Sequence, residues 1–277
     1  MKQSCIICFC LILIVCTVCQ AQTINIKPYF IYHQSVSKQD EPVFYNIYLP
    51  IDGGTGFHYV NANSFSKGFT LATGLEYGFT IDYTFRNQLG FELGLGYFNS
   101  LVKIDEPSDL NPLSRGFIYG SDWNYHSIAV RPLFSYTVVT GKSAFIGKIG
   151  PSVHYASATR NSFYMNEKLS TCTFADRFNW GYSTGIEYNY PLLKQLSLAM
   201  ELGFEQYRYT PDKATVEYEE KFAFERKKDE ICYVNKVVHE PTFAYHSLPL
   251  QNKRIKESVL FNNLYFGIGI KYNLWKK

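Results

Sequence analysis

Side chains alternate with a period of two along residues 69–85, FTLATGLEYGFTIDYTF. The odd positions are uncharged and mostly aromatic or aliphatic, whereas the even positions are small or polar and include Glu76 and Asp82. Successive side chains of a strand point to opposite faces, so this stretch is predicted to be a strand with one apolar face and one small, polar face. The pattern resumes after Arg86-Asn87-Gln88 in residues 89–97, LGFELGLGY, which predicts a hairpin.

The same pattern recurs in two more hairpins and in one strand at each end of the chain. The eight expected strands cover residues 24–33, 69–85, 89–97, 126–139, 144–160, 177–193, 196–210 and 264–274. Turns of about three or four residues alternate with long links at 34–66, 105–122, 161–176 and 211–258. This asymmetry is typical of outer-membrane barrels, which have short periplasmic turns and long outer loops. The expected fold is all-β, an eight-stranded antiparallel up-and-down transmembrane β-barrel that forms one domain over residues 22–277.

The amino end has the pattern of a secretory signal peptide. Lys2 precedes an apolar run over residues 5–18, and the polar, small-residue segment that follows predicts cleavage after Ala21, so that residues 1–21 are removed. The run is shorter than the roughly 20 residues that a membrane-spanning helix needs. Lipid modification at Cys16 or Cys19 is the alternative, but a bulky valine precedes each of them.

The apolar face of the strands is expected to contact lipid. A soluble, lipocalin-like barrel would turn its apolar face inward and crowd its outer face with charge. Here the polar positions are largely Gly, Ala, Ser and Thr, which fit the narrow centre of an eight-stranded barrel. No charge interrupts the apolar face of the second, third, sixth or seventh strand, where a midplane Lys or Arg would cost about 2–4 kcal/mol. Tyr83, Phe85, Tyr188 and Tyr190, beside two of the short turns, resemble an interfacial aromatic girdle.

Composition agrees with a strand-rich chain. Aromatic residues make up 17% of the sequence, with 23 Tyr and 22 Phe, and aromatics favour strands. The net charge of +3, which falls to +2 without Lys2, is too small to indicate nucleic acid as a partner.

Over essentially the whole mature chain, this pattern resembles the small outer-membrane β-barrels of Gram-negative bacteria, the OmpA-like, OmpX-like and PorT-like families. In the last strand, Gly269, Tyr272 and Leu274 match the Gly-x-x-aromatic-x-hydrophobic pattern that the assembly machinery of the family reads. Many members end on an aromatic residue, whereas this chain continues past Trp275 into two lysines. The resemblance implies an outer-membrane location, with membrane lipid and the barrel-assembly machinery as partners.

The polar face places charged residues in the barrel centre. Within each strand, every second residue faces the centre. The acidic residues at these inner positions are Glu76, Asp82, Glu92, Glu187, Glu201 and Glu205, the basic ones are Lys27, Arg131, Lys148 and Lys271, and His154 can titrate. Charges in a narrow, poorly hydrated space need partners, so a structural ion-pair network is expected. A narrow gated pore or proton path is the alternative, and a surplus of two acids, six against four bases, would make it weakly cation-selective.

The sequence gives little support for a catalytic or cofactor-binding site. Ser127 directly follows His126 in a strand, so their side chains point to opposite faces and cannot form a catalytic pair. His58, His239 and His246 lie in predicted outer loops. Metal-ligand spacing is missing, and the glycine cluster at 53–56 lacks the context of a nucleotide site. We expect no enzyme, cofactor or metal, with an enzyme acting on lipid or peptide as an alternative.

The outer loops leave two questions open. Cys172 and Cys232, the only cysteines of the mature chain, could form a loop-to-loop disulfide or remain thiols. The links at 34–66 and 211–258 could form β extensions or a cap, or a docking surface for a protein, glycan or envelope complex. The expected function is a non-enzymatic outer-membrane barrel, an envelope structural component or a scaffold whose outer loops contact a partner.

Overall fold

The computed structural model describes residues 23–36, 47–50, 57–60, 71–85, 87–106, 119–164, 167–218, 228–234, 253–255 and 259–276. The predicted signal peptide, His239, His246 and the glycine cluster lie outside these residues. Among the described residues, no helix is both long and apolar enough to span a membrane.

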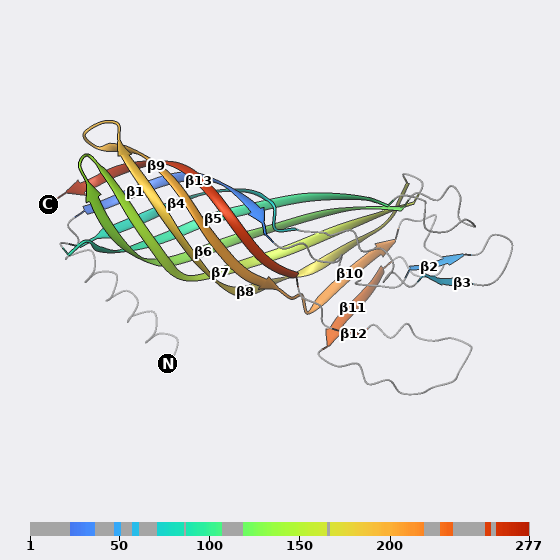
Figure 1. The fold of residues 1–277 in the computed structure, drawn as a ribbon. Helices are drawn as coiled ribbons and strands as arrows, with labels where there is room; N and C mark the ends of the chain where they lie inside the picture. Colours follow the sequence, from blue (N-terminus) through green and yellow to red (C-terminus); the bar gives the residue numbers. More distant parts are fainter. Residues whose placement is uncertain are drawn as a thin grey trace, which may run out of the picture.

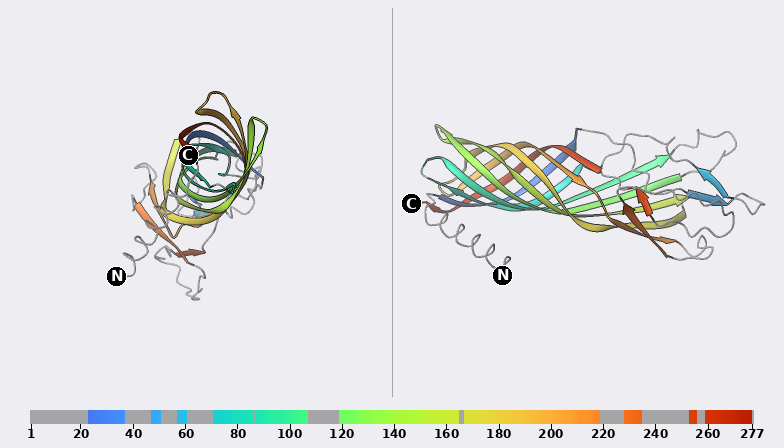
Figure 2. Two further views of the ribbon diagram at one scale, coloured as in Figure 1. Left: turned by 90° about the vertical axis from the view of Figure 1, so that its left-hand side faces the viewer. Right: turned by 90° about the horizontal axis from the view of Figure 1, so that it is seen from below.

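Eight antiparallel strands close into a barrel, which confirms the predicted fold class (Figure 1). The strands are β1 (Thr23–Ser35), β4 (Gly74–Thr84), β5 (Leu89–Glu106), β6 (Tyr119–Thr140), β7 (Ser143–Tyr164), β8 (Glu167–Pro191), β9 (Leu196–Tyr209) and β13 (Val259–Lys276). Each pairs with its neighbour along this order, and β1 pairs with β13 to complete the ring. Figure 2 shows this ring along its axis.

The short turns lie together at one end of the barrel. They follow β4, β6 and β8, and the same end holds the start of β1 and the end of β13, where Thr23 pairs with Lys276. In the turn after β6, Gly141 has a φ of 61°, a left-handed conformation that glycine adopts without steric cost. We call this end the turn end and the opposite one the outer end.

At the outer end the sheet continues beyond the closed barrel. The predicted loop at 161–176 is wrong in extent, because β7 and β8 run through it and pair with each other there. β5 and β6 likewise lengthen into the predicted loop at 105–122. The first predicted hairpin differs at its start, since β4 begins at Gly74 rather than at residue 69, and Leu71 and Ala72 are buried outside the strand.

The long links carry additional strands. The link at 211–258 contains β10 (Lys213–Tyr218), β11 (Lys228–Val234) and β12 (Lys253–Ile255), which extend the sheet from the outer part of β8. The link at 34–66 contains the hairpin of β2 (Ile47–Pro50) and β3 (Phe57–Val60). Figures 1 and 2 show the long strands β5 to β8 projecting past the barrel together with β10 to β12. The predicted β extension above the barrel is therefore present in the described part of these links.

The outer surface of the barrel carries an apolar belt. On β13 the outward side chains are 41–54% exposed and alternate with buried or half-buried residues; they are Leu264, Phe266, Ile268, Ile270, Tyr272 and Leu274. Toward the outer end, Asn262 is the next outward residue of β13, and its side chain accepts a hydrogen bond from Gln206 of β9. The belt therefore ends in polar side chains. Tyr190, in the predicted girdle beside the turn after β8, is 49% exposed.

The two cysteines of the mature chain flank β10. Cys172, buried in β8, is opposite Val216 of β10, and Cys232 of β11 is opposite Lys213 on the other side of β10. Two strand spacings of about 4.8 Å each exceed the Cα separation of roughly 4.4–6.8 Å that a disulfide allows. This register disfavours the bridge between Cys172 and Cys232.

Candidate functional site

All eleven charged or titratable residues predicted for the barrel centre point into it. They are at most 8% exposed and come from all eight barrel strands: Lys27, Glu76, Asp82, Glu92, Arg131, Lys148, His154, Glu187, Glu201, Glu205 and Lys271. Glycines on the same inner face give these side chains room. A Cβ on Gly96 would lie 2.3 Å from Oε1 of Glu76, so a larger residue there would displace this carboxylate.

Three lysines and four carboxylates form one cluster near the turn end. We call it the lysine cluster: Lys27, Lys148, Lys271, Asp82, Glu92, Glu187 and Glu201. Lys148 Nζ donates to Glu92 at 2.6 Å and to Glu201 at 2.9 Å. Glu187 accepts from all three lysines and so joins β1, β7 and β13 through one carboxylate. The net charge of the ionised cluster is −1, three positive charges against four negative ones.

A second cluster surrounds Arg131, further from the turn end. The guanidinium donates to both oxygens of Glu205, at 2.6 and 2.9 Å, and to both oxygens of Glu76, at 2.6 and 2.7 Å. His33 Nε2 lies 3.1 Å from Glu76, and His154 Nε2 lies 3.3 Å from Glu205. Two bidentate pairs on one guanidinium give geometric specificity as well as energy. These five residues are the arginine cluster.

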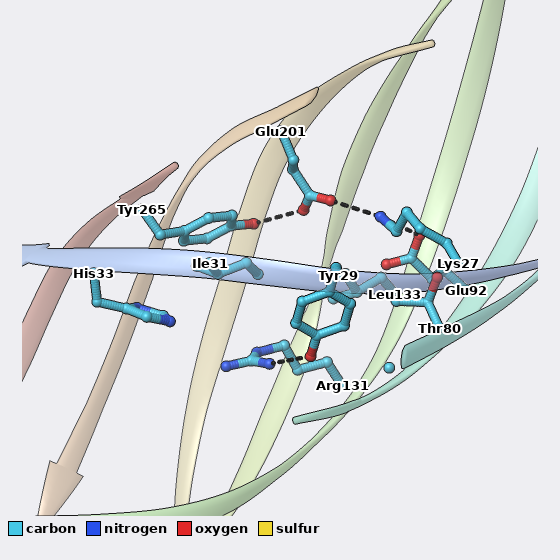
Figure 3. A pocket seen from close by; sticks show the side chains of 11 residues that line it. Lys27, Tyr29, Ile31, His33, Thr80, Glu92, Arg131, Leu133, Glu201 and Tyr265 are labelled. Atoms are coloured by element: carbon cyan, nitrogen blue, oxygen red, sulfur yellow. Dashed lines mark hydrogen bonds and ion pairs between the residues drawn. The ribbon is translucent and has the colours of Figure 1, made fainter. Parts of the chain in front are cut away.

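A small cavity lies against both clusters (Figure 3). Its lining includes Lys27, Glu92, Glu201, Arg131 and His33, and its volume is about 20 Å³. That volume holds about one water molecule. The cavity therefore does not amount to a continuous channel.

Beyond the arginine cluster, buried aromatic rings fill the barrel. His154 stacks on Tyr207 at a centroid distance of 3.7 Å, Tyr207 stacks on Phe261 at 4.4 Å, and Phe261 contacts Tyr125 at 4.6 Å. Trp123 stacks on Phe174 at 5.5 Å in the same core. We call this layer the aromatic plug. The sequence analysis predicted only His154 of this layer, because the aromatic residues belong to strand parts that lie near or beyond the predicted strand ends.

The sequence analysis did not include three further inward residues in the site: His33, Tyr29 and Tyr265. His33 and Tyr29 share the inner face of β1 with Lys27, as their odd numbers indicate, so the signal was present in the sequence. The hydroxyl of Tyr29 donates to Glu76 at 2.8 Å, and that of Tyr265 donates to Glu201 at 3.1 Å. Both tyrosines thus supply hydrogen bonds to carboxylates of the two clusters.

One set of inward residues has the composition of a metal site. Ligand atoms of His33, Glu76 and Glu205 lie within 4.8 Å of one another. The guanidinium of Arg131, however, is bonded to both carboxylates. The positive charge that a metal ion would supply is therefore already provided by a side chain.

Two serines contact histidines, although not in the pair considered from the sequence. Ser157 Oγ lies 3.1 Å from Nε2 of His126 across β6 and β7, at a register shift in β7. Ser152 Oγ lies 3.1 Å from Nε2 of His154, the same nitrogen that faces Glu205. A catalytic triad needs the serine and the acid on different ring nitrogens. The buried His154 therefore lacks triad geometry.

The predicted assembly signal lies on β13. Tyr272 and Leu274 point outward, 41% and 52% exposed, whereas Gly269 packs closely against β1. A Cβ on Gly269 would lie 2.6 Å from the carbonyl oxygen of Pro28. The glycine is therefore explained by strand packing within the barrel.

Comparison with known proteins finds no matching family model and no matching curated protein. Among solved structures, the outer membrane protein OprG from Pseudomonas aeruginosa is similar, with 12% identity, coverage of 92% of this chain and 97% of that chain, and a TM-score of 0.45. A major outer membrane protein from Thermus thermophilus has 12% identity, coverage of 91% and 99%, and a TM-score of 0.46. The outer membrane protease OmpT from Escherichia coli has 9% identity, coverage of 92% and 97%, and a TM-score of 0.30.

Proposed function

We propose that this chain is a non-enzymatic outer-membrane β-barrel with a sealed centre, serving as an envelope structural component or as a scaffold. The observation that carries the proposal is the filled barrel. Two layers of paired charges and a layer of stacked aromatic rings occupy it, and a cavity of about 20 Å³ lies between the charged layers.

The apolar belt supports placement in a membrane. On β13 it runs from Leu264 to Leu274, ten residue steps of about 3.4 Å. With a strand tilt of about 40°, this run rises about 26 Å, close to the roughly 25 Å belt of outer-membrane barrels. If this same barrel were placed in water, the outward leucines and aromatic residues of the belt would be exposed to solvent. The predicted signal peptide supplies the route of export.

The extended sheet at the outer end supports the scaffold role. The strands β5 to β8 reach beyond the barrel and are joined there by β10 to β12, so they hold a surface above the membrane (Figure 1). Rigid strands that carry loops are a common support for binding surfaces. A protein, glycan or envelope complex is the proposed class of partner.

Conductance measurements in planar bilayers test the sealed barrel. Purified mature protein inserted into the bilayer is expected to show no steady conductance above the bilayer background. A gated narrow pore is the alternative; it predicts discrete conductance steps that weakly favour cations. Such steps in the wild type, abolished when Glu76 and Glu205 are replaced by Gln, would refute the sealed barrel.

A serine-reactive probe tests the enzyme alternative, which the contact of Ser157 with His126 motivates. A fluorophosphonate is expected to leave the folded barrel unlabelled, because the described residues show no carboxylate on His126 to orient it. Labelling that disappears in both Ser157→Ala and His126→Ala would refute the non-enzymatic assignment.

A further inference from the structure

On three neighbouring strands, the apolar belt gives way to polar side chains at the same row of paired residues. The last row of the belt there is Tyr97 of β5, Ile128 of β6 and Tyr155 of β7, which are register partners. Ile128 and Tyr155 are 47% and 40% exposed. Outward residues of a strand are two positions apart, so the next outward row lies about 7 Å further toward the outer end. This row and the one after it form the surface directly beyond the belt.

The two rows beyond the belt carry mainly uncharged polar side chains. The first row is Asn99, His126 and Ser157, and the second is Leu101, Asn124, Thr159 and Thr173. Asn99, Asn124 and Thr173 are exposed. We call the six polar residues of these rows the polar platform.

The amide groups of the platform have unused hydrogen-bonding capacity. The side chains of Asn99 and Asn124 form no hydrogen bond with the described part of the chain. Amides at the belt edge of the opposite wall differ, since Gln206 of β9 donates to Asn262 of β13, and Gln34 of β1 accepts from a tyrosine at 3.0 Å. The platform therefore combines exposure with amides that are available to a ligand.

The platform is held in place from its inner side. There the core residues Trp123, Tyr125 and Phe174 are at most 1% exposed, and the strands continue side by side past the barrel (Figure 1). The next outward row contains Lys103 and Asp122, register partners of opposite sign. A strongly charged partner thus meets no excess charge on this face. A protein partner would meet a polar centre, whereas protein–protein interfaces have an apolar, aromatic centre.

We propose that the polar platform binds the uncharged sugar headgroups of glycolipids in the membrane leaflet at the outer end. The proposal rests on the proposed function, because it requires the belt to lie in a bilayer. Amides donate and accept hydrogen bonds, as sugar hydroxyls do. Tyr155 and the 66% exposed Phe178 of β8, with ring centroids 4.9 Å apart, border the platform and can pack against the C–H face of a sugar.

The position of the platform favours a sugar attached to a lipid over a free glycan. The platform begins where the belt ends, so acyl chains that lie on the belt would hold their headgroup at the height of Asn99 and His126. A free glycan lacks this second contact and is expected to bind more weakly.

Native mass spectrometry of the full mature barrel in a polyoxyethylene detergent, which carries no sugar, tests the proposal. The wild type, N99A/N124A and the control Q206A/N262A are titrated with digalactosyl diacylglycerol and, separately, with phosphatidylcholine of the same acyl chains. The control removes two amides that already bond each other on the opposite wall. One net hydrogen bond changes binding by about fivefold. The wild type should prefer the galactolipid, the platform variant should lose at least about fivefold of this preference, and the control should keep it.

Several outcomes overturn the inference. Equal binding of the two lipids by the wild type, or equal loss of preference in the two variants, would do so. If the free digalactosyl disaccharide bound as tightly as the galactolipid, the platform would be assigned to a soluble glycan instead. Insertion is measured separately as resistance of vesicle-bound protein to urea extraction. A barrel that fails to insert refutes the proposed function, whereas an inserted barrel without lipid preference refutes only the platform.

Discussion

Replacing Arg131 by Met should destabilise the barrel more than any change of a surface charge. The guanidinium is buried and bonded to both oxygens of Glu76 and of Glu205, at 2.6–2.9 Å. Methionine has a similar volume but no charge. The variant would leave two buried carboxylates facing each other, near His33, His154 and the hydroxyl of Tyr29 but without a buried cation between them.

The expected loss of stability is the balance between the lost attraction of the ion pairs and the lower desolvation cost. At an effective dielectric constant of about 20, unit charges 4 Å apart attract by about 4 kcal/mol, so two pairs contribute about 8 kcal/mol. Removing Arg131 also removes the cost of desolvating its charge, which is several kcal/mol. Loss of one partner from a buried ion pair typically costs about 3–5 kcal/mol, and we expect Arg131→Met to lower the free energy of unfolding by a similar amount.

Urea unfolding in lipid vesicles, followed by tryptophan fluorescence, measures this loss. The variant R131M/E76Q/E205Q should recover most of it, because no unpaired charge then remains. The matched control is Arg177→Met, which breaks the half-exposed pair with Asp212 and should cost less than about 1 kcal/mol. A loss below about 1 kcal/mol in Arg131→Met, or a triple variant no more stable than the single one, would refute the reasoning.

At acidic pH, the free energy of unfolding of Arg131→Met should be closer to that of the wild type. Protons taken up by the two carboxylates that face each other replace part of the lost positive charge. The loss of stability is therefore expected to be smaller at pH 5 than at pH 8. A loss that is larger at pH 5 would contradict the assignment of unpaired negative charge.

A thiol introduced at Leu93, in the middle of the belt, should resist a water-borne maleimide in vesicles, whereas one at Lys103 should react; equal reaction rates would place Leu93 in water. Gly203→Ala should lower stability by about 1–3 kcal/mol, because its Cβ would lie 2.3 Å from the ring of Tyr265, while Gly147→Ala, which meets no atom within 4 Å, should change it little. Equal thermal shifts in the two glycine variants would argue against this packing. The two cysteines of the mature chain should both titrate as thiols after denaturation without reductant, and a count of zero would restore the disulfide.

The barrel could be predicted because lipid imposes a simple rule on its strands. Outward positions such as Leu93 and Ile268 must be apolar, and inward positions such as Glu92 and Lys271 must fit a narrow interior. This rule operates only over the height of the bilayer. Beyond it, the exposed residues of β8 include the polar Lys168 and Thr173, so the apolar pattern ends there although β7 and β8 continue and pair.

The partition of the charges into two clusters was not predictable from parity. The alternation of side chains places both Glu76 and Glu187 on inner faces. It does not distinguish them, because their strands have the same alternating pattern. Their partners depend on strand stagger and on how far each side chain reaches across the interior. Arg131 reaches Glu76 and Glu205, whereas Lys148 reaches Glu187, and these choices appear only in the folded barrel.

The amino-acid sequence alone therefore determined the class of fold, the number of barrel strands and the inward direction of the charged residues, because a two-residue period is a local property of the strand. The tertiary structure decided which charges pair, that aromatic rings close the outer end, and that β10 separates the two cysteines. These features depend on contacts between strands far apart in the chain, and their geometry is set by closure of the sheet, which no single segment encodes.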